Sequence, residues 1–376
     1  MDILTALCSV PTAPFVEGRV VAFVEEFVRA RKGLRLSRDD DGNLLIEARG
    51  TQRGAARWVF TAHMDHPGFV ARAMTDDRTL TADFRGAVLA SYVLGSKVRF
   101  FPDGAAEIRG TVTDVVAQAK GTPWAKSATI AVARPVPPNA PGMFDQGVGR
   151  VKGKRFYSRV CDDLAGAAAA LAMIDELARK PAPSPVAVLL TRAEEAGFIG
   201  AIAAVLKPRL LTKDDRIVAI ETSAEQPYAP QGKGAIIRIG DRTSVFNSSL
   251  SYFMTQQAEA LKKRDAAFAY QRALMPGGTC EATVYDVWGY HAGSICVALG
   301  NYHNMDRAKE AIGPEYIDLA DWANMVKLFL RVARQGHAYE PGHVELRKRL
   351  EKRFKASARL LAPPKGRGGA GGQAGS

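Results

Sequence analysis

The sequence predicts an α/β fold in which a mixed central sheet is interrupted by a small all-β domain. Apolar runs rich in strand-forming residues alternate with helix-like segments over most of the chain, as in α/β proteins. Between residues 68 and 157 this pattern gives way to short alternating segments separated by Gly, Pro and Asp. A chain of 376 residues is also too long for one comfortable core, so an insertion or a second domain is expected.

The periodicity of apolar residues assigns the elements of the α/β part. An apolar face predicts a helix over 16–31, and the turn signal in DDDGNLLIEARG predicts strands over 33–49. The further strands expected are RWVFTAH, PVAVLLT, DRIVAIE and SICVALG, and the further helices are DDLAGAAAALAMIDELARK, GFIGAIAAVLKPRL, 251–272 and 314–335. Acidic residues open the first of these helices, where they favour its macrodipole.

The central region is typical of a small β-barrel or sandwich. Its alternating segments include TLTADFRG, SKVRFFPDG, EIRGTVTDVVA and SATIAVARPV. We therefore predict an α/β domain made of residues 1–67 and 158–340, an inserted β domain over 68–157, and a tail over 341–376.

The composition is that of a globular protein, with 47% hydrophobic and 24% charged residues. No apolar run approaches the roughly 20 residues that a membrane span requires. No basic residues precede the apolar residues at the N-terminus, so a secretory signal is not expected. The four cysteines are scattered and form no CxxC pair, which favours a reduced, cytoplasmic protein.

The net charge of +12 is concentrated in the tail, where 341–376 hold nine Lys or Arg against two Asp or Glu. Leu346, Leu350 and Phe354 recur every four residues there, which predicts a basic amphipathic helix, and the Gly-rich end PPKGRGGAGGQAGS predicts disorder. A basic arm could touch nucleic acid or an acidic membrane surface. We favour a solvated tail or packing on a neighbouring subunit, and expect no membrane partner and no nucleic acid.

Acidic and imidazole side chains follow the predicted strands at several points. They are His63, Asp65, Asp162, Glu194, Glu195, Glu221 and His303, of which only Asp162 has no strand-like run before it. In an open α/β sheet, ligands gather beyond the carboxyl ends of the strands. Each residue alone has an ordinary explanation, such as a helix cap for an Asp pair. Their conjunction favours a common site.

Two divalent metals about 3.5–4 Å apart need a bridging carboxylate, and each needs further carboxylate or imidazole ligands. We assign Asp162 as the bridge, Glu195 and His303 to one metal, and His63 and Glu221 to the other. These ligands suit zinc first, with cobalt or manganese as alternatives.

The two remaining acids have supporting roles in this hypothesis. Asp65 would accept a hydrogen bond from the His63 ring and so fix its tautomer. Glu194 precedes a ligand by one residue, so it can point into the same cleft without binding metal. We interpret it as the general base, which takes a proton from water and passes it to a leaving amine.

The motif order HxD…DD…EE…E…H, with a small β domain after HxD, resembles the cytosolic di-metal aminopeptidases of the deblocking and glutamyl aminopeptidase type. This family includes the tetrahedral, self-compartmentalised peptidases. The resemblance extends over roughly 1–335 and includes SVPTAPFVEGRV, QGKGAIIRIGD, GGTCEA and the final YHN.

The resemblance implies a zinc-exopeptidase-like α/β/α sandwich and a metallo-aminopeptidase that acts on short peptides. It also implies a homo-oligomer, from a dimer up to a dodecamer. The family's metal ligands match His63, Asp162, Glu195, Glu221 and His303, its base matches Glu194, and its substrate-binding segment matches Gly277, Gly278 and Thr279.

Three positions depart from the family pattern. His66 replaces an acidic residue, Glu221 replaces Asp, and Cys280 replaces Asp. These departures keep open a second hypothesis, an amidohydrolase or deacylase of N-acyl amino acids or small amides that uses the same two metals. A third is a binding or scaffolding protein that works through its tail, against which the intact Glu194 argues.

Overall fold

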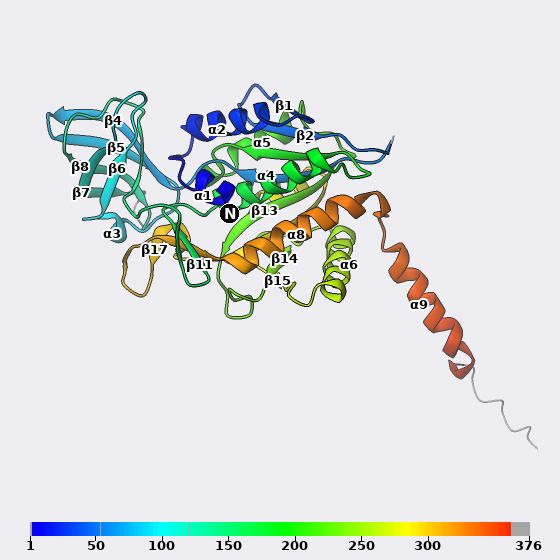
Figure 1. Cartoon of the computed structure of the whole chain (residues 1–376). Helices are drawn as coiled ribbons and strands as arrows, with labels where there is room; N and C mark the ends of the chain where they lie inside the picture. Colours follow the sequence, from blue (N-terminus) through cyan, green and yellow to red (C-terminus); the bar gives the residue numbers. More distant parts are fainter. Residues whose placement is uncertain (1, 53, 120, 362–376) are drawn as a thin grey trace, which may run out of the picture. The chain divides into compact units, whose positions relative to one another are not determined.

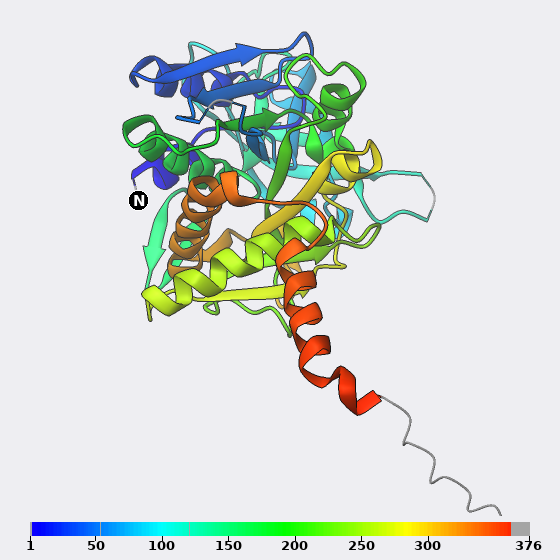
Figure 2. The ribbon, with the colours of Figure 1, turned by 90° about the vertical axis from the view of Figure 1, so that its right-hand side faces the viewer.

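The computed structural model describes residues 2–52, 54–119 and 121–361 (Figures 1 and 2). The chain divides into a large unit, Met1–Tyr339, and a small unit, Glu340–Ser376. The large unit contains two sheets of functional interest, an 11-stranded mixed sheet and a closed barrel.

The mixed sheet runs in the order β1-β2-β12-β3-β13-β16-β19-β11-β10, with β14 and β15 branching from β16. Four neighbouring strands, β12, β3, β13 and β16, are parallel, so their carboxyl ends lie at one edge. The bounds are β1 Leu34–Arg38, β2 Leu44–Ala48, β3 Trp58–His63, β10 Arg150–Lys152, β11 Arg155–Ser158, β12 Val186–Thr191, β13 Arg216–Ala224, β14 Ala235–Gly240, β15 Tyr270–Leu274, β16 His291–Gly300 and β19 Glu315–Asp318.

Helices cover both faces of this sheet because its buried strands are apolar on both sides. In β3, Trp58 and Phe60 pack into the core on one face, whereas Val59 packs into the core on the other. The first face is covered by α1 Asp2–Leu7, α2 Gly18–Arg29, α4 Leu164–Arg179, α6 Ser248–Arg264 and α8 Leu319–Gln335, and the second by α5 Ile199–Leu206 and α7 Glu281–Val287. The predicted α/β/α sandwich is confirmed.

The second sheet is a six-stranded barrel closed in the order β4-β5-β8-β7-β6-β9. Its strands are β4 Gly68–Asp76, β5 Thr79–Arg85, β6 Lys97–Phe100, β7 Ile108–Ala117, β8 Ala125–Val132 and β9 Pro141–Phe144, with the short helix α3 Ala90–Val93 beside them. Phe69, Phe84, Phe100 and Phe144 pack ring against ring inside it. Gly142 is required there, because a Cβ atom would lie 2.5 Å from the Phe100 ring.

Two predicted helices include segments that form strands in the structure. The helix expected over 251–272 ends at Arg264, and Tyr270–Leu274 forms β15, which pairs with β14. The helix expected from 314 begins at Leu319, because β19 pairs with β11 and β16 first. Tertiary strand pairing, which local periodicity does not record, overrides helix propensity in both places.

The small unit contains α9, Val344–Ser357, none of whose residues is buried. Leu350 and Phe354 are exposed on this basic helix. The predicted disorder of 363–376 concerns residues outside the described ranges. Within those ranges, no helix has the length and apolar character needed to cross a membrane.

The aromatic core of the barrel can be tested by Phe69→Ala. This change should lower the free energy of unfolding by about 3–5 kcal/mol, because it leaves a cavity among three rings. Urea denaturation followed by circular dichroism measures the loss. Val116→Ala on β7 is the control, since Val116 is 53% exposed and surface substitutions change stability by about 0.5 kcal/mol or less. Equal losses for both variants would contradict this assignment of the core.

Candidate active site

The residues singled out in the sequence meet at the carboxyl edge of the parallel strands. His63 is the last residue of β3, and Glu194 and Glu195 begin the short 3-10 helix η1, Glu194–Ala196, after β12. His303 lies in η2, Tyr302–Asn304, directly after β16, whereas Glu221 lies inside β13, three residues before its end. Asp162 comes from the loop between β11 and α4, and its peptide bond to Asp163 is cis.

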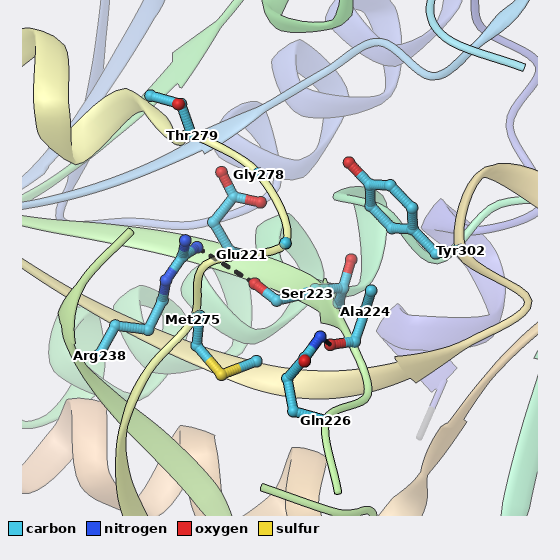
Figure 3. A pocket seen from close by; sticks show the side chains of 11 residues that line it. Glu221, Ser223, Ala224, Gln226, Arg238, Met275, Gly278, Thr279 and Tyr302 are labelled. Atoms are coloured by element: carbon cyan, nitrogen blue, oxygen red, sulfur yellow. Dashed lines mark hydrogen bonds between the residues drawn. The ribbon is translucent and has the colours of Figure 1, made fainter. Parts of the chain in front are cut away.

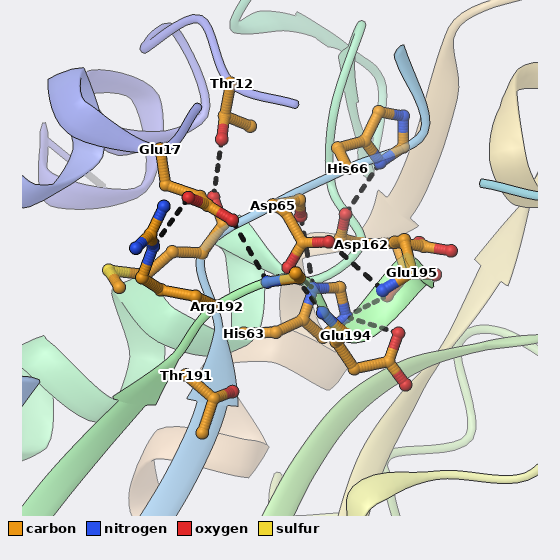
Figure 4. Close-up of polar contacts among 12 residues, drawn as sticks. Thr12, Glu17, His63, Asp65, His66, Asp162, Thr191, Arg192, Glu194 and Glu195 are labelled. Atoms are coloured by element: carbon orange, nitrogen blue, oxygen red, sulfur yellow. Dashed lines mark hydrogen bonds and ion pairs between the residues drawn. The ribbon is translucent and has the colours of Figure 1, made fainter. Parts of the chain in front are cut away.

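Asp162 lies between the two imidazoles. Its Oδ1 is 3.4 Å from Nε2 of His63, and its Oδ2 is 3.6 Å from Nε2 of His303. Glu195 Oε1 lies 3.1 Å from the same His303 nitrogen. Figure 4 shows His63 and Asp162 facing each other, with Glu194 and Glu195 beside them. One carboxylate is therefore shared by two imidazoles that come from distant parts of the chain.

Backbone carbonyls fix which nitrogen of each imidazole faces Asp162. His63 Nδ1 lies 3.1 Å from the Asp65 carbonyl oxygen, and His303 Nδ1 lies 2.9 Å from the carbonyl oxygen of Ala87. Because a carbonyl oxygen can only accept, each Nδ1 carries the hydrogen. In the neutral ring the Nε2 lone pair then faces the carboxylates, as a metal ligand requires. The Tyr302 ring, stacked 3.7 Å from the His303 ring, also holds it in place.

The Asp65 carboxylate has a different contact from the one expected. Its two oxygens accept hydrogen bonds from the backbone N–H groups of Glu194, at 3.0 Å, and Glu195, at 3.1 Å. Asp65 Oδ1 lies 3.6 Å from His63 Nδ1, whereas the backbone carbonyl oxygen of Asp65 lies 3.1 Å from it. The carbonyl oxygen is therefore the nearer acceptor for the ring. Asp65 thus connects the end of β3 to the turn that carries the two glutamates.

The arrangement of these donors fits divalent cations. Two sets of ligand atoms each lie within 4.8 Å of one another, one from His63, Glu194 and Glu221, the other from His63, Asp162 and Glu195. Ligand atoms about 2.1 Å from a tetrahedral zinc are about 3.4 Å apart, close to the separations around Asp162. Glu195 Oε1 is buried beside His303 Nε2, which is consistent with a cation ligand. Both sets differ in part from our assignment, since the first groups Glu221 with Glu194 and the second groups His63 with Glu195.

The charges of the site also favour cations. Burial, together with the charge of Asp162, raises the pKa of Glu221 to about 8. Burial raises the pKa of Glu194 well above its usual value, although His63 opposes the shift. Burial lowers the pKa of His303, but Glu195 and Asp162 outweigh it and raise the value to about 9. The raised pKa values show that these crowded carboxylates and imidazoles bind protons tightly when no cation is present. Divalent cations would take the place of those protons and stabilise the same negative charges.

Two buried residues behind the site hold its loops together. The Glu315 carboxylate accepts hydrogen bonds from the N–H groups of Cys161 at 2.7 Å, Asp162 at 3.0 Å and His303 at 2.9 Å. His66 Nδ1 donates to the Asp162 carbonyl oxygen at 2.7 Å, and His66 Nε2 lies 2.9 Å from Asn304 Oδ1. His66 therefore has a structural contact to the loops, whereas His291, at the start of β16, lies at the far end of that strand.

A pocket opens beside Glu221, and the segment Gly277–Thr279 lines it (Figure 3). Arg238 and Tyr302 line the same pocket. The Arg238 side chain is buried and donates to Ser223 Oγ at 3.1 Å. Asp241 positions the lining segment, since its carboxylate accepts from the Cys280 N–H at 3.0 Å and from N–H groups of its own turn.

Arg238 and Glu315 were missed in the sequence analysis for the same reason. Arg238 is a single charged residue within an apolar strand, and Glu315 begins the short strand EYID. Nothing in either local pattern distinguishes the residue from an exposed edge residue. The only signal was the isolation of Arg238 in AIIRIG, where apolar residues precede and follow it.

The sequence profile of the M42 glutamyl aminopeptidase family matches residues 42–319, most of the chain. The protein is therefore a peptide hydrolase. It belongs to the M42 glutamyl aminopeptidase family, as the resemblance in its motifs predicted.

Solved structures of other proteins have the same fold. An aminopeptidase from the archaeon Desulfurococcus kamchatkensis is 21% identical, with a TM-score of 0.75 over 91% of this chain and 98% of that one. The Pyrococcus horikoshii TET1 peptidase, described as assembling into a tetrahedron or a large octahedral shell, is 21% identical, with a TM-score of 0.72 over 88% and 98%. No curated protein sequence gives a significant match.

The role of Glu315 can be tested by Glu315→Gln. In the glutamine variant, the side-chain NH₂ group would face one of the backbone N–H groups that donate to Glu315, so two donors would meet. We expect the free energy of unfolding to fall by about 1–3 kcal/mol and zinc affinity to fall about 10–100-fold. Urea denaturation and competition with a chromophoric chelator measure the two effects. Glu310→Gln, an exposed glutamate on the same segment, is the control. Unchanged zinc affinity in Glu315→Gln would contradict this role.

Proposed function

We propose that this M42 peptidase is a metal-dependent aminopeptidase that removes N-terminal residues from short peptides. The observation that carries the proposal is the position of Asp162, whose two carboxylate oxygens each face the Nε2 atom of a different, correctly oriented imidazole. A carboxylate in this position is the shared ligand that a two-metal site requires.

The proposed ligands are the five residues inferred from the sequence. Asp162 would bridge two cations, with Glu195 and His303 on one side and His63 and Glu221 on the other. Zinc is our first choice because imidazole and carboxylate ligands suit it, and cobalt and manganese are the alternatives. When bound, two such cations polarise the scissile carbonyl group and lower the pKa of water.

Glu194 is the proposed general base. Its Oε2 lies 3.9 Å from His63 Nε2, so its carboxylate borders the site, and the preceding and following backbone is held by buried groups. Burial raises its pKa well above the usual value, which suits a group that must accept and then release a proton. Glu194 takes a proton from the attacking water and delivers it to the nitrogen of the leaving amine.

The pocket beside Glu221 is the proposed binding site for the first residue of the peptide. Gly277, Gly278 and Thr279 form one wall of it, where small side chains leave room for the substrate. The carboxylates around Glu194 and Glu221 provide a negative environment for the protonated α-amine of a peptide. The site therefore distinguishes a free N-terminus from a blocked one.

The assembly and location of the protein are part of the same proposal. We propose a homo-oligomer, between a dimer and a dodecamer, since the similar Pyrococcus horikoshii peptidase forms closed shells. We also propose a cytoplasmic enzyme with no membrane or nucleic-acid partner, since all four cysteines are free and buried. The M42 family does not favour the deacylase or the scaffolding hypothesis.

Two substitutions separate metal binding from proton transfer. Asp162→Asn should lose both metals, because a neutral amide cannot serve as the bridging anion. Glu194→Gln should keep both metals and lose activity by about 10²–10⁴-fold, because it cannot accept a proton. Elemental analysis gives the metal content per chain, and hydrolysis of aminoacyl and peptide substrates gives the activity.

Asp214→Asn and Glu225→Gln are the matched controls, since both residues are exposed. Each should bind metal and hydrolyse peptides as the unchanged protein does. The two-metal proposal is wrong if Asp162→Asn retains both metals, or if the unchanged protein stays active after complete removal of metals by a chelator.

Free and acetylated peptides test which bond the enzyme cleaves. A peptide with a free N-terminus should be hydrolysed at least about 100-fold faster than its N-acetylated form, because acetylation removes the charge that the buried carboxylates attract. A matched pair of fluorogenic peptides, assayed at equal concentration with added zinc or cobalt, measures the ratio. Faster release of the acetyl group than of the amino acid would support a deacylase instead.

A further inference from the structure

An N-terminal segment, residues 12–17, packs against the back of the active site. Thr12 Oγ donates to the carbonyl oxygen of Met64, the residue between His63 and Asp65, at 2.8 Å. Glu17 reaches the turn that leads into Glu194 (Figure 4). This segment belongs to the SVPTAPFVEGRV motif and precedes residue 42, where the match to the family profile begins.

Both oxygens of the Glu17 carboxylate have hydrogen-bond donors, and its side chain is 0% exposed. Oε1 accepts from the backbone N–H of Ala193 at 3.0 Å and from that of Phe15 at 2.8 Å. Oε2 accepts from Arg192 Nε at 2.8 Å. An amide in this position would direct its NH₂ group at one of these donors, so a carboxylate is required.

The turn that Glu17 holds is strained. Ala193 has φ 51° and ψ 43°, a left-handed conformation that a residue other than Gly adopts only when its surroundings enforce it. Asp65 accepts the next two N–H groups, those of Glu194 and Glu195. Two buried carboxylates therefore accept three consecutive backbone N–H groups.

Arg192 fixes Glu17 and the turn to two further loops. Its guanidinium donates to the carbonyl oxygen of Asp41 at 3.1 Å and to that of Phe15 at 3.0 Å, besides its ion pair with Glu17. The backbone N–H of Arg192 donates to Asn43 Oδ1 at 3.2 Å. The turn between β12 and η1 is thus attached to the N-terminal segment and to the β1–β2 turn.

We infer that Glu17 is a positioning residue, which sets the Glu194 carboxylate in the orientation needed for proton transfer. The inference rests on the proposed role of Glu194 as general base. Glu17 does not touch the reacting atoms; it acts through Ala193, one residue before the base. A displacement of about 1 Å in a catalytic group can cost about 100-fold in rate.

Glu17→Ala and Glu17→Gln test this role. Glu17→Ala should lower kcat about 100-fold with KM changed less than threefold, and Glu17→Gln, which keeps one acceptor oxygen, should lower kcat about tenfold. Both variants should retain the full metal content, measured per chain by elemental analysis. Glu26→Ala, a change of an exposed glutamate on α2, should match the unchanged protein. A kcat within twofold of the unchanged value for Glu17→Ala would overturn the inference.

A second measurement separates positioning from general loss of structure. If Glu17 acts only through the base, Glu17→Ala introduced into Glu194→Gln should cause less than a threefold further loss of residual activity. An equal loss in both backgrounds would show a structural effect and overturn the inference. Failure of the proposed function itself would give a different result. The unchanged protein would then be inactive on peptides, or Glu194→Gln would remain active, whatever the effect of Glu17→Ala.

Discussion

The contact between one buried carboxylate and two imidazoles is the constraint on which the candidate active site depends. Asp162 can face both His63 and His303 only if the end of β3, the end of β16 and the loop before α4 meet within a few ångströms. The parallel strands β3, β13 and β16 bring two of these segments together, because their carboxyl ends share one edge. Glu315 attaches the third segment, the loop before α4, because its carboxylate accepts the backbone N–H groups of both Asp162 and His303.

Buried acids in this protein have two distinct uses. Glu195 and Glu221 face the proposed cations, whereas Glu17, Asp65 and Glu315 accept backbone N–H groups and hold loops in place. Carboxylates suit the second use because charged acceptors form stronger hydrogen bonds, and each oxygen can accept more than one. The same residue type therefore provides both the ligands and the framework that orients them.

The barrel also contributes to the geometry of the site. The carbonyl oxygen of Ala87, two residues after β5, accepts the Nδ1–H of His303 and so leaves its Nε2 facing Asp162. The inserted β domain thus affects the chemistry of His303, which lies 216 positions after Ala87 in the chain. Any displacement of the barrel relative to the large sheet would rotate a proposed metal ligand.

The sequence by itself determined the α/β class and the barrel-like insertion, and it predicted seven acidic and imidazole residues for the candidate site, because strand periodicity and ligand-type side chains are local features. It did not determine that 270–274 and 315–318 pair as strands, since pairing depends on distant partners. Nor did it determine that Asp65, Glu17 and Glu315 hold backbone N–H groups. Which donor a carboxylate meets is decided only when residues far apart in the chain pack together, so that information exists in the tertiary structure alone.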